Sequence, residues 1–428
     1  MRFAFARSFV ACGLLFVGVS SSPVALSAQP TVNPDGEITL AEAIDAALRS
    51  NPELLASGYE LNAAQARIVQ AGLRPNPELA ADLENFAGRG SLRGVDGLET
   101  TLSLSQVIEM GDKRQLRTSA ARADLDLVTI EQRAKELDVL AEVTRRFIDV
   151  VAAQERARFA TEATGLAERT LSAIGTRVDA GRSPEAERSR ARIAVTRAQV
   201  EQRQAQSELR SARYALSALW GSPEPAFTGS KADLFDLRAV QPFASLMQRL
   251  EESPDFIRFA SEGRLREAEL RLARAQARPN LGLRLGVRRL EESSDSALVA
   301  GFSMPLGVSD RNQGAIQEAK VRLTQSDAQR DAARVRARAS LFSLYQEMNA
   351  ARERVDIVRN EAIPQAQQAV DQTASGYERG RFSFLELVSV QEELLALRAA
   401  AIDAAADYHR LRAEIERLTS EPLNRPAP

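Results

Sequence analysis

The residue types that most often do chemistry in proteins are scarce in this sequence. Its 428 residues include one histidine, His409, and one cysteine, Cys12. A zinc site needs several such ligands and a disulfide needs two cysteines, so a single chain can build neither. A lone histidine is more often packed or solvated than metal-bound. No nucleotide-binding, zinc-protease or esterase motif occurs, and a secreted hydrolase has no constellation of residues behind it. The sequence predicts no enzyme activity, no metal site and no cofactor.

Charged side chains are abundant but balanced. They make up 27% of the residues, with 56 Lys and Arg against 58 Asp and Glu, a formal net charge of −2. A nucleic-acid-binding protein would carry a basic excess, so this class is excluded. The negative mean hydropathy excludes a polytopic helical membrane protein, which needs several long apolar stretches. Few aromatics beside much Ala, Arg, Glu and Leu favour long helices.

The first thirty residues read as a targeting segment. An apolar run over 9–19 follows a basic start and is too short to span a bilayer. Ala25 and Ser27 then form a small-residue cleavage pattern, so we predict a secretory signal peptide over 1–28. The alternative is a buried N-terminal helix. Cleavage at Cys12 would leave almost no hydrophobic segment, so we expect no lipid anchor.

The rest of the chain consists of two similar repeats. Four landmarks recur in the same order about 200 residues later, which indicates an internal duplication. They include Arg74-Pro75-Asn76 with Arg278-Pro279-Asn280, Asp112-Lys113-Arg114 with Asp310-Arg311-Asn312, and Gly181-Arg182 with Gly380-Arg381. We expect a first repeat over 29–223, a linker over 224–243, a second repeat over 244–420 and a C-terminal tail over 421–428.

Each repeat is predicted to contain long helices, over 112–219 and 310–419. Apolar residues recur there at alternating spacings of four and three, which keeps one helix face against a partner. The first helix would run for roughly 90 Å. Gly181 and Gly380 each join two long helices and mark hairpin tips. A second stripe of Ile193, Val200 and Tyr214 favours neighbours on both sides, as in a cylinder wall; the alternative is a two-stranded coiled coil.

Two β-hairpins are predicted, at about 76–108 and 279–306. Leucines alternate there with Gly, Arg, Thr and Ser, and a period of two with one apolar face is typical of a strand. The alternative is a pair of soluble hairpins packed on helices. Arg284 and Arg288 fall on the polar side. Facing lipid they would cost about 2–4 kcal/mol each, so we expect them to face a water-filled lumen.

Four strands are too few to close a membrane barrel. An open sheet edge in lipid leaves backbone groups without hydrogen bonds, at several kcal/mol each, and bacterial barrels begin at about eight strands. If these strands lie in lipid, two or more chains must therefore pool them. Three chains would form a barrel of about twelve strands, continued by a helical tube.

At this point the chain resembles a known family, the TolC-like outer membrane factors, over about residues 39–420. The matching features are Leu40-Ala41-Glu42-Ala43-Ile44 before Asn51-Pro52-Glu53-Leu54, then Arg74-Pro75-Asn76-Pro77, the duplicated hairpin, and Gly376-Tyr377-Glu378-Arg379-Gly380. Glu109-Met110-Gly111-Asp112-Lys113-Arg114 resembles the cobalt–zinc–cadmium (CzcC-type) subgroup, with Asp112 in place of a second glycine. Ser303-Met304-Pro305-Leu306 with Asp310-Arg311-Asn312 also resembles it. These motifs lie where strand passes into helix, so we expect them to supply a bend.

The resemblance implies a mainly α protein with a small β part, assembled as a homotrimer in the outer membrane of a Gram-negative bacterium. A twelve-stranded β-barrel in lipid would continue into a periplasmic α-helical barrel. The implied partners are a periplasmic adaptor and an inner-membrane resistance–nodulation–division pump, and the subgroup implies heavy-metal cations as cargo. The alternative is a periplasmic coiled-coil adaptor or scaffold, which would not need an apolar strand face.

The resemblance also implies a closed resting state in which bonds hold the tips inward. Tyr377 and Gly380 match the family's tip tyrosine and glycine, and Glu187 matches a tip aspartate. Phe382 stands where the family has an arginine, with Arg381 before it, so the gating network is expected to be wired differently here.

Two tip carboxylates leave two interpretations open. Glu386 falls where some members have the first aspartate of a lumenal ring. Together with Glu187 it could form acidic rings that concentrate cations once the chain is oligomeric. Both residues could equally be ordinary carboxylates at helix N-termini, where they complement the helix dipole.

Overall fold

Residues 33–238 and 241–420 are described by a computed structural model. The predicted signal peptide with Cys12 and the predicted C-terminal tail lie outside the described residues. Residues 239–240 of the predicted linker lie outside them too.

The two halves of the chain carry the same succession of helices, hairpin and long helices. The first half contains β1 (Gly36–Ile38), α1 (Leu40–Ser50), α2 (Pro52–Ala71), β2 (Glu78–Glu84), η1 (Gly90–Leu92), β3 (Glu99–Ile108), α3 (Lys113–Asp179), α4 (Glu185–Ser217), η2 (Ala218–Trp220) and β4 (Phe227–Ser230). The second contains α5 (Phe243–Glu251), α6 (Pro254–Gln276), β5 (Leu281–Leu290), β6 (Asp295–Ser303), α7 (Gln313–Ile357), the π-helix η3 (Val358–Ala362), α8 (Ile363–Glu378) and α9 (Phe384–Thr419). Helix dominates, as the composition predicts.

The residues that carry the N-terminal family motif begin helices. Thr39 and Glu42 form a reciprocal capping box at the start of α1. The Asn51 side chain accepts hydrogen bonds from the backbone of Glu53 and Leu54, and Pro52 occupies the first position of α2. Asn51 also donates to the Leu219 carbonyl at 2.8 Å, so this cap ties the start of α2 to the end of the first repeat.

The two hairpins join into one antiparallel sheet in the order β2-β3-β5-β6. Thr101 lies opposite Arg288 and Leu102 opposite Val287, so the register puts like residues on one face. One face is apolar, formed by Leu79, Leu83, Leu102, Leu104, Leu283, Leu285, Val287, Leu298, Ala300 and Phe302. The other is polar, formed largely by Glu78, Asp82, Glu84, Glu99, Thr101, Ser103, Ser105, Arg284, Arg288, Asp295 and Ser303.

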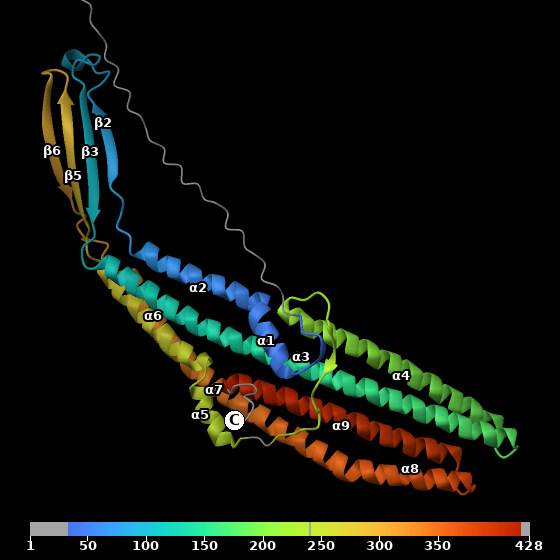
Figure 1. Ribbon diagram of the computed structural model, residues 1–428. Helices are drawn as coiled ribbons and strands as arrows, with labels where there is room; N and C mark the ends of the chain where they lie inside the picture. The colour runs from blue at the N-terminus through green and yellow to red at the C-terminus, as the bar shows by residue number, and fades with distance from the viewer. Residues whose placement is uncertain (1–32, 239–240, 421–428) are drawn as a thin grey trace, which may run out of the picture. The chain divides into compact units, whose positions relative to one another are not determined.

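The apolar face of the sheet is uncovered. Leu285, Leu298 and Phe302 are 69%, 89% and 80% exposed. Figure 1 shows the strands standing beyond the ends of the helices, so soluble hairpins packed on helices are the wrong description. No helix in the described part of the chain is both long and apolar enough to cross a membrane.

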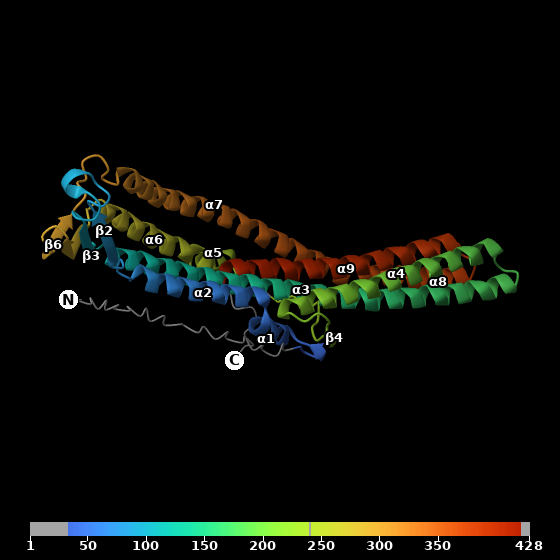
Figure 2. The ribbon, with the colours of Figure 1, turned by 90° about the horizontal axis from the view of Figure 1, so that it is seen from above.

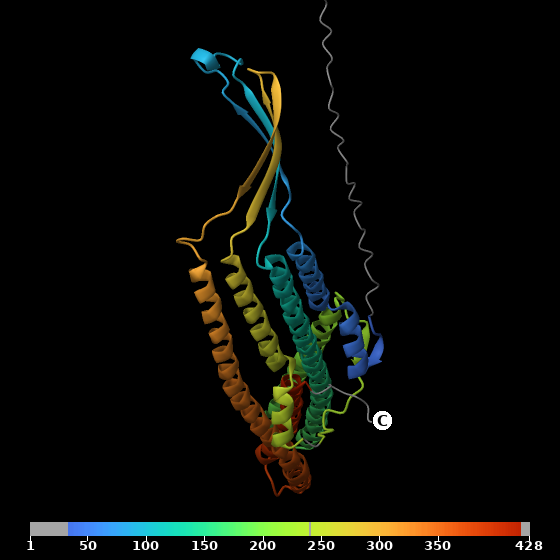
Figure 3. The same ribbon diagram turned by 90° about the vertical axis from the view of Figure 1, so that its left-hand side faces the viewer.

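Below the sheet, four helices lie side by side in the order α7, α6, α3, α2 (Figure 3). They follow the strand order above them, because each strand continues into, or comes from, a helix of the layer. Further along, α3 pairs with α4, and α8 pairs with α9, and α3 also contacts α9. Both pairs end in a hairpin tip far from the strands (Figures 1 and 2). A two-stranded coiled coil is therefore wrong, since α3 packs against α1, α2, α4, α6 and α9.

The long helix is continuous in one half and interrupted in the other. α3 runs for 67 residues, roughly 100 Å at 1.5 Å per residue. In the second half, η3 separates α7 from α8, and Pro364 lies in the first turn of α8. Proline has no N–H to donate, so the regular hydrogen-bond ladder cannot continue through it.

The largest core lies midway along the helices, where the short sheet of β1 and β4 meets α1, α3 and α9. Trp220, Val143 and Val150 are fully buried there. Ile193, Val200 and Tyr214, the predicted second stripe, remain exposed within this chain.

The repeat is offset slightly from the match made on sequence. Asp112 and Asn312 hold the same place, as left-handed caps at the starts of α3 and α7, with φ of 58° and 57°. The sequence match of Asp112 with Asp310 is therefore wrong by two residues. The loop before α7 is longer than the loop before α3 and carries the extra residues.

Candidate functional site

The two hairpin tips turn in the same way. Gly181 and Gly380 both have a φ of 71°, a left-handed conformation that suits glycine. In each tip the following residue donates from its backbone to a carbonyl five residues earlier: Arg182 to Arg177, and Arg381 to Gly376, both at 2.8 Å. This is the Schellman arrangement that ends a helix. Both glycines therefore lie where the sequence places them.

Tyr377 joins the two tips. Its hydroxyl donates to Glu187 Oε2 at 2.8 Å and lies 3.4 Å from Ser183 Oγ, both in the first tip. The Arg177 guanidinium lies over the Tyr377 ring, 4.6 Å from its centre, and donates to the Glu378 carbonyl at 3.1 Å. Cation–π contact and hydrogen bonds thus link residues about 200 positions apart in the sequence.

The contact between the two tips is buried around Tyr377. Tyr377 is 6% exposed and packs with Ile174, Ala191, Phe384 and Leu387. Burial, with Glu187 close by, raises the pKa of the Tyr377 hydroxyl, although the Ser183 hydrogen bond opposes this. The phenol therefore keeps its proton at neutral pH and remains a donor to the carboxylate.

Phe382, which stands where the resemblance leads us to expect an arginine, is used for packing. A Cβ on Gly376 would lie 2.1 Å from the Phe382 ring, so the ring lies directly on that glycine. Arg381 is exposed and forms no ion pair with the described residues. The structure therefore brings Tyr377 and Glu187 together but leaves Arg381 outside the network.

Glu386 caps its own helix. It accepts hydrogen bonds from the Ser383 backbone N–H at 2.6 Å and from the Ser383 hydroxyl at 2.8 Å, a capping box at the start of α9. These hydrogen bonds lower the pKa of the Glu386 carboxyl. The first tip has no equivalent, because Pro184 stands at the cap of α4 and offers no side-chain acceptor.

The two strand arginines share the polar face of the sheet but differ in partners. Arg288 pairs with Glu99 at 2.6 Å and with Glu84 at 3.1 Å, and donates to Thr101 Oγ1 at 3.0 Å. Arg284 lies opposite Ser105 and is exposed. The polar face can thus hold charge, provided that water reaches it.

The sequence missed the role of Lys113, at the corner where β3 passes into α3. Lys113 is 8% exposed, and its Nζ donates to the Arg278 carbonyl at 2.5 Å and to Asn280 Oδ1 at 2.6 Å. Burial lowers its pKa, an effect opposed by the nearby Glu109 carboxylate. The ammonium therefore fastens the first half of the chain to the corner between α6 and β5 in the second.

The backbone at this corner explains the motif that the sequence reads as a bend. Gly111 and Asp112 have φ of 75° and 58°, two successive left-handed residues. A Cβ on Gly111 would lie 2.4 Å from Arg278 Cδ. Arg117 makes a two-armed pair with Glu109, which lowers the pKa of the Glu109 carboxyl and braces the bend. The spacing in the motif signals the turn, but nothing local in it identifies Arg278 and Asn280 as partners.

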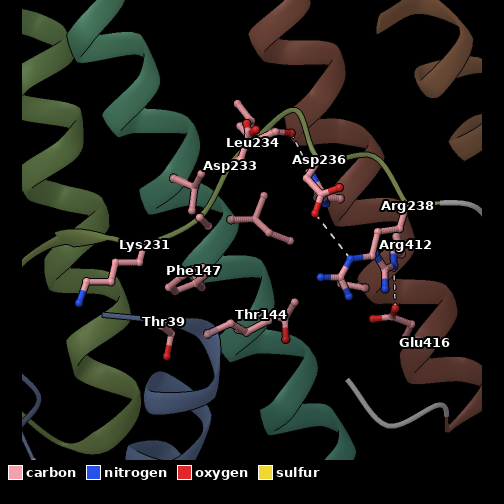
Figure 4. A pocket seen from close by; sticks show the side chains of 16 residues that line it. Thr39, Thr144, Phe147, Lys231, Asp233, Leu234, Asp236, Arg238, Arg412 and Glu416 are labelled. Atoms are coloured by element: carbon pink, nitrogen blue, oxygen red, sulfur yellow. Dashed lines mark hydrogen bonds and ion pairs between the residues drawn. The ribbon is translucent and has the colours of Figure 1, made fainter. Parts of the chain in front are cut away.

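The segment 231–238 crosses α3 and α9 (Figure 4), and His409 of α9 lines the pocket beside this segment. Its Nε2 lies 2.9 Å from the Leu234 carbonyl, and burial lowers its pKa, so the ring is neutral at pH 7. A hollow of about 430 Å³ opens here between Phe147 and Leu234, with charges at its rim that include Arg412 paired with Glu416 at 2.7 Å. His409 thus holds the linker segment in place.

The described chain thus has an exposed sheet at one end and two joined hairpin tips at the other. A family model described as outer membrane efflux protein matches residues 43–222 and 246–421. The chain belongs to the outer membrane efflux protein family, which confirms the resemblance seen in the sequence. It is an outer-membrane component of efflux, and the match decides against the periplasmic adaptor that the sequence leaves open.

Particular relatives narrow the comparison. The chain is 30% identical to the cobalt-zinc-cadmium resistance protein CzcC of Cupriavidus metallidurans, over 90% of both chains. It is 27% identical to the nickel-cobalt-cadmium resistance protein NccC of Alcaligenes xylosoxydans xylosoxydans, over 71% of this chain and 70% of that one.

Solved structures share the fold. A crystal structure of CusC matches with a TM-score of 0.77 at 18% identity, over 92% of this chain and 95% of that one. The outer membrane protein VceC of Vibrio cholerae matches with a TM-score of 0.71 at 20% identity, over 89% and 95%.

Proposed function

We propose that three copies of this chain form one passive exit duct, with a twelve-stranded barrel in the outer membrane and an α-helical tube in the periplasm. The observation that carries the proposal is that both layers of the chain stop at open edges. The sheet ends at β2 and β6, and the helix layer ends at α2 and α7 (Figure 3). A copy that adds at one edge extends both layers at once.

The open helix edges carry matching apolar stripes. On α7 exposed apolar residues recur every seven positions, and along α2 they recur at spacings of four, seven, three and four, which keep the heptad phase. They are Val321, Ala328, Val335 and Phe342 on α7, and Leu55, Tyr59, Ala66 and Val69 on α2, with Leu73 just after its end. Heptad stripes of this kind pack against each other in left-handed pairs. The exposed Ile193, Val200 and Tyr214 on α4 would face a neighbouring copy in the same way.

The two faces of the sheet suit the two sides of such a barrel. Leu298 and Phe302 would lie in outer-membrane lipid, which stabilises apolar side chains. Arg284 and Arg288 would lie in the water-filled lumen. The strands alone would hold the mature chain in the membrane, without a lipid anchor.

The tips would form the periplasmic end of the duct. There Tyr377 and Glu187 would hold the two hairpins of each copy together in a closed resting state, with Gly181 and Gly380 at the turns. Arg381, exposed at the end, would be available to a periplasmic adaptor. We assign Glu386 to the cap of α9 rather than to an acidic ring, because its carboxylate is already used by Ser383.

Heavy-metal cations are the proposed cargo, delivered by an inner-membrane pump of the resistance–nodulation–division class. The support is the kinship to proteins named for cobalt, zinc, cadmium and nickel resistance. A passive duct selects little, so the pump would choose the cargo.

Mass measurement and a deletion strain test the proposal separately. Light scattering of the detergent-purified mature chain should give three copies per particle, and a monomer would contradict the duct. A strain lacking the gene should be more sensitive to cobalt, zinc or cadmium than its parent. If metal sensitivity is unchanged and drug sensitivity rises, the proposal of metal cations as cargo is wrong, whereas the proposal of an exit duct stands.

A further inference from the structure

The contact made by Lys113 in the first half of the chain has no equivalent in the second half. Lys113, at the start of α3, donates to Arg278 and Asn280 between α6 and β5. By the repeat, the start of α7 corresponds to the start of α3, and Arg74-Pro75-Asn76 between α2 and β2 corresponds to Arg278-Pro279-Asn280. The equivalent contact would therefore join the loop 304–312 to Arg74-Pro75-Asn76.

One chain cannot make that second contact. The loop 304–312 comes just before the start of α7, and Arg74-Pro75-Asn76 comes just after the end of α2. These two helices form opposite edges of the helix layer (Figure 3). Burial differs accordingly. Lys113 is buried and Asn280 half-buried, whereas Gln313 and Asn76 are exposed. Neither Arg74 nor Asn76 has a side-chain hydrogen bond or ion pair with the described residues.

The exposed loop carries the groups that this contact requires. Gln313, in the place of Lys113, is uncharged and bonds its own loop at Ser309 and Arg311. The cation is supplied instead by Arg311, whose Nε donates to the Gly307 carbonyl at 3.3 Å and whose side chain has no ion pair within the described chain. Beside it, Leu306 and Val308 are 76% and 72% exposed, an apolar surface uncommon on a polar loop.

The opposite surface is complementary in charge and shape. Arg74 and Asn76 offer backbone and amide oxygens like those of Arg278 and Asn280, and the Arg74 guanidinium can pair with Asp310 of the loop. Exposed Leu73 and half-buried Pro75 lie beside them and can cover Leu306 and Val308. The hydrogen-bonded cation repeats what Lys113 supplies inside the chain, and the apolar cover would be added between copies.

We propose that the loop 304–312 of one copy docks on Arg74-Pro75-Asn76 of the next copy, with Arg311 donating to the Arg74 carbonyl and to Asn76 Oδ1. The contact that Lys113 makes with Arg278 and Asn280 within each chain would then have an equivalent between chains. Each hairpin would be bonded at its base to the neighbouring hairpin around the barrel. This inference rests on the proposed trimer and specifies where its copies lock at the membrane boundary.

Cysteine cross-linking tests the docking directly, because the sequence has no cysteine after Cys12. The full chain carrying Pro77→Cys and Ser309→Cys, two exposed positions that leave Arg311 and Asn76 in place, is purified in detergent and treated with a short bis-maleimide. We expect linked dimers and trimers on a denaturing gel, most of the material being linked. The matched control, Pro77→Cys with Gln329→Cys, places the second cysteine several turns down α7 and should stay unlinked.

Light scattering on the same untreated sample tests the trimer separately from the docking of the loop 304–312. A trimer that gives no linked species, or equal linking in the Gln329→Cys control, overturns the docking and leaves the proposed channel intact. A monomer without linking overturns both.

A charge series provides a second readout in otherwise unaltered chains. Arg311→Glu should speed dissociation of the trimer about tenfold, as expected for loss of a charged hydrogen bond, and Arg311→Lys should restore most of the lifetime. Equal lifetimes for Arg311→Glu and the natural chain would overturn the role given to Arg311.

Discussion

The two halves of this chain build the same unit with different stiffness. α3 is one helix from the sheet to the tip, enclosed by five other helices. Its counterpart is split by η3 and runs along the open edge of the layer, where α7 contacts α5, α6 and α9. The comparison teaches that a duplicated helix keeps strict regularity where its own chain surrounds it and tolerates an irregular turn where its own chain leaves one side uncovered.

The ends of the long helices differ as well. The start of α3 is fastened by Lys113, and the start of α7 is exposed. At the tips the order is reversed, since Ser383 and Glu386 cap α9 whereas α4 begins with an uncapped Pro184. Each half thus has one long helix whose start is held by side-chain hydrogen bonds, α3 in the first half and α9 in the second. The following substitutions test this asymmetry.

The largest expected effect comes from copying the second half's proline into the first. Thr164→Pro stands 200 residues before Pro364, in a buried turn of α3, and should cost about 3 kcal/mol or more because it removes a hydrogen bond and clashes with the preceding turn. Pro364→Ala, the control, should change stability by about 1 kcal/mol or less. Thermal unfolding followed by circular dichroism in detergent measures both. Equal losses would mean that η3 is no more tolerant than α3.

The next effect is at the corners. Lys113→Met should destabilise the chain by about 2 kcal/mol, because the Arg278 carbonyl and Asn280 lose a charged donor in a buried place. Gln313→Met at the matching position should cost about 1 kcal/mol or less, since that side chain is uncharged, exposed within its chain and bonded only to its own loop. Denaturant unfolding of the two variants measures both losses of stability. Similar unfolding midpoints would contradict the proposed difference between the start of α3 and the start of α7.

A smaller effect is expected where the tips meet. Tyr377→Phe keeps the packing but deletes the hydrogen bond to Glu187, so it should cost about 1 kcal/mol and raise single-channel conductance in planar bilayers. Tyr345→Phe is the control, because that ring packs on Phe243 away from the tips. A closed channel with natural conductance in Tyr377→Phe would show that this bond does not hold the tips.

The smallest effect is a pH dependence that distinguishes the second tip from the first. The pKa of Glu386 is lower in the folded chain than in the unfolded one, so its stabilising contribution is complete above the ordinary glutamate pKa and is lost as the pH falls through the lowered value. Amide exchange should therefore speed up at the start of α9, relative to α4, as the pH drops below about 4. Ser383→Ala should abolish the difference, and equal acceleration at α4 would refute it.

Sequence reasoning succeeds here where the signal is local. The alternation of leucines predicts the apolar sheet face, and the unbroken heptad pattern predicts the length of α3, because both depend on residues close together in the chain. It fails where the contact is remote: Lys113 and Asn280 are 167 residues apart. Charge alone left Glu386 undecided between a ring and a cap, although Ser383 stands three residues before it, at the spacing of a capping box. The extra loop before α7 displaced the match of Asp112 by two residues.

The pairing of β3 with β5 sets an order of events in biogenesis. Glu99 meets Leu290 only after all of α3, α4, α5 and α6 have been made and exported, which is a very long loop to close. A hairpin of two strands is marginal on its own, so β2 and β3 gain little stability before then. The sheet is therefore assembled late, and a polypeptide truncated after the first repeat would carry an unprotected hairpin, open to proteases and to holding chaperones.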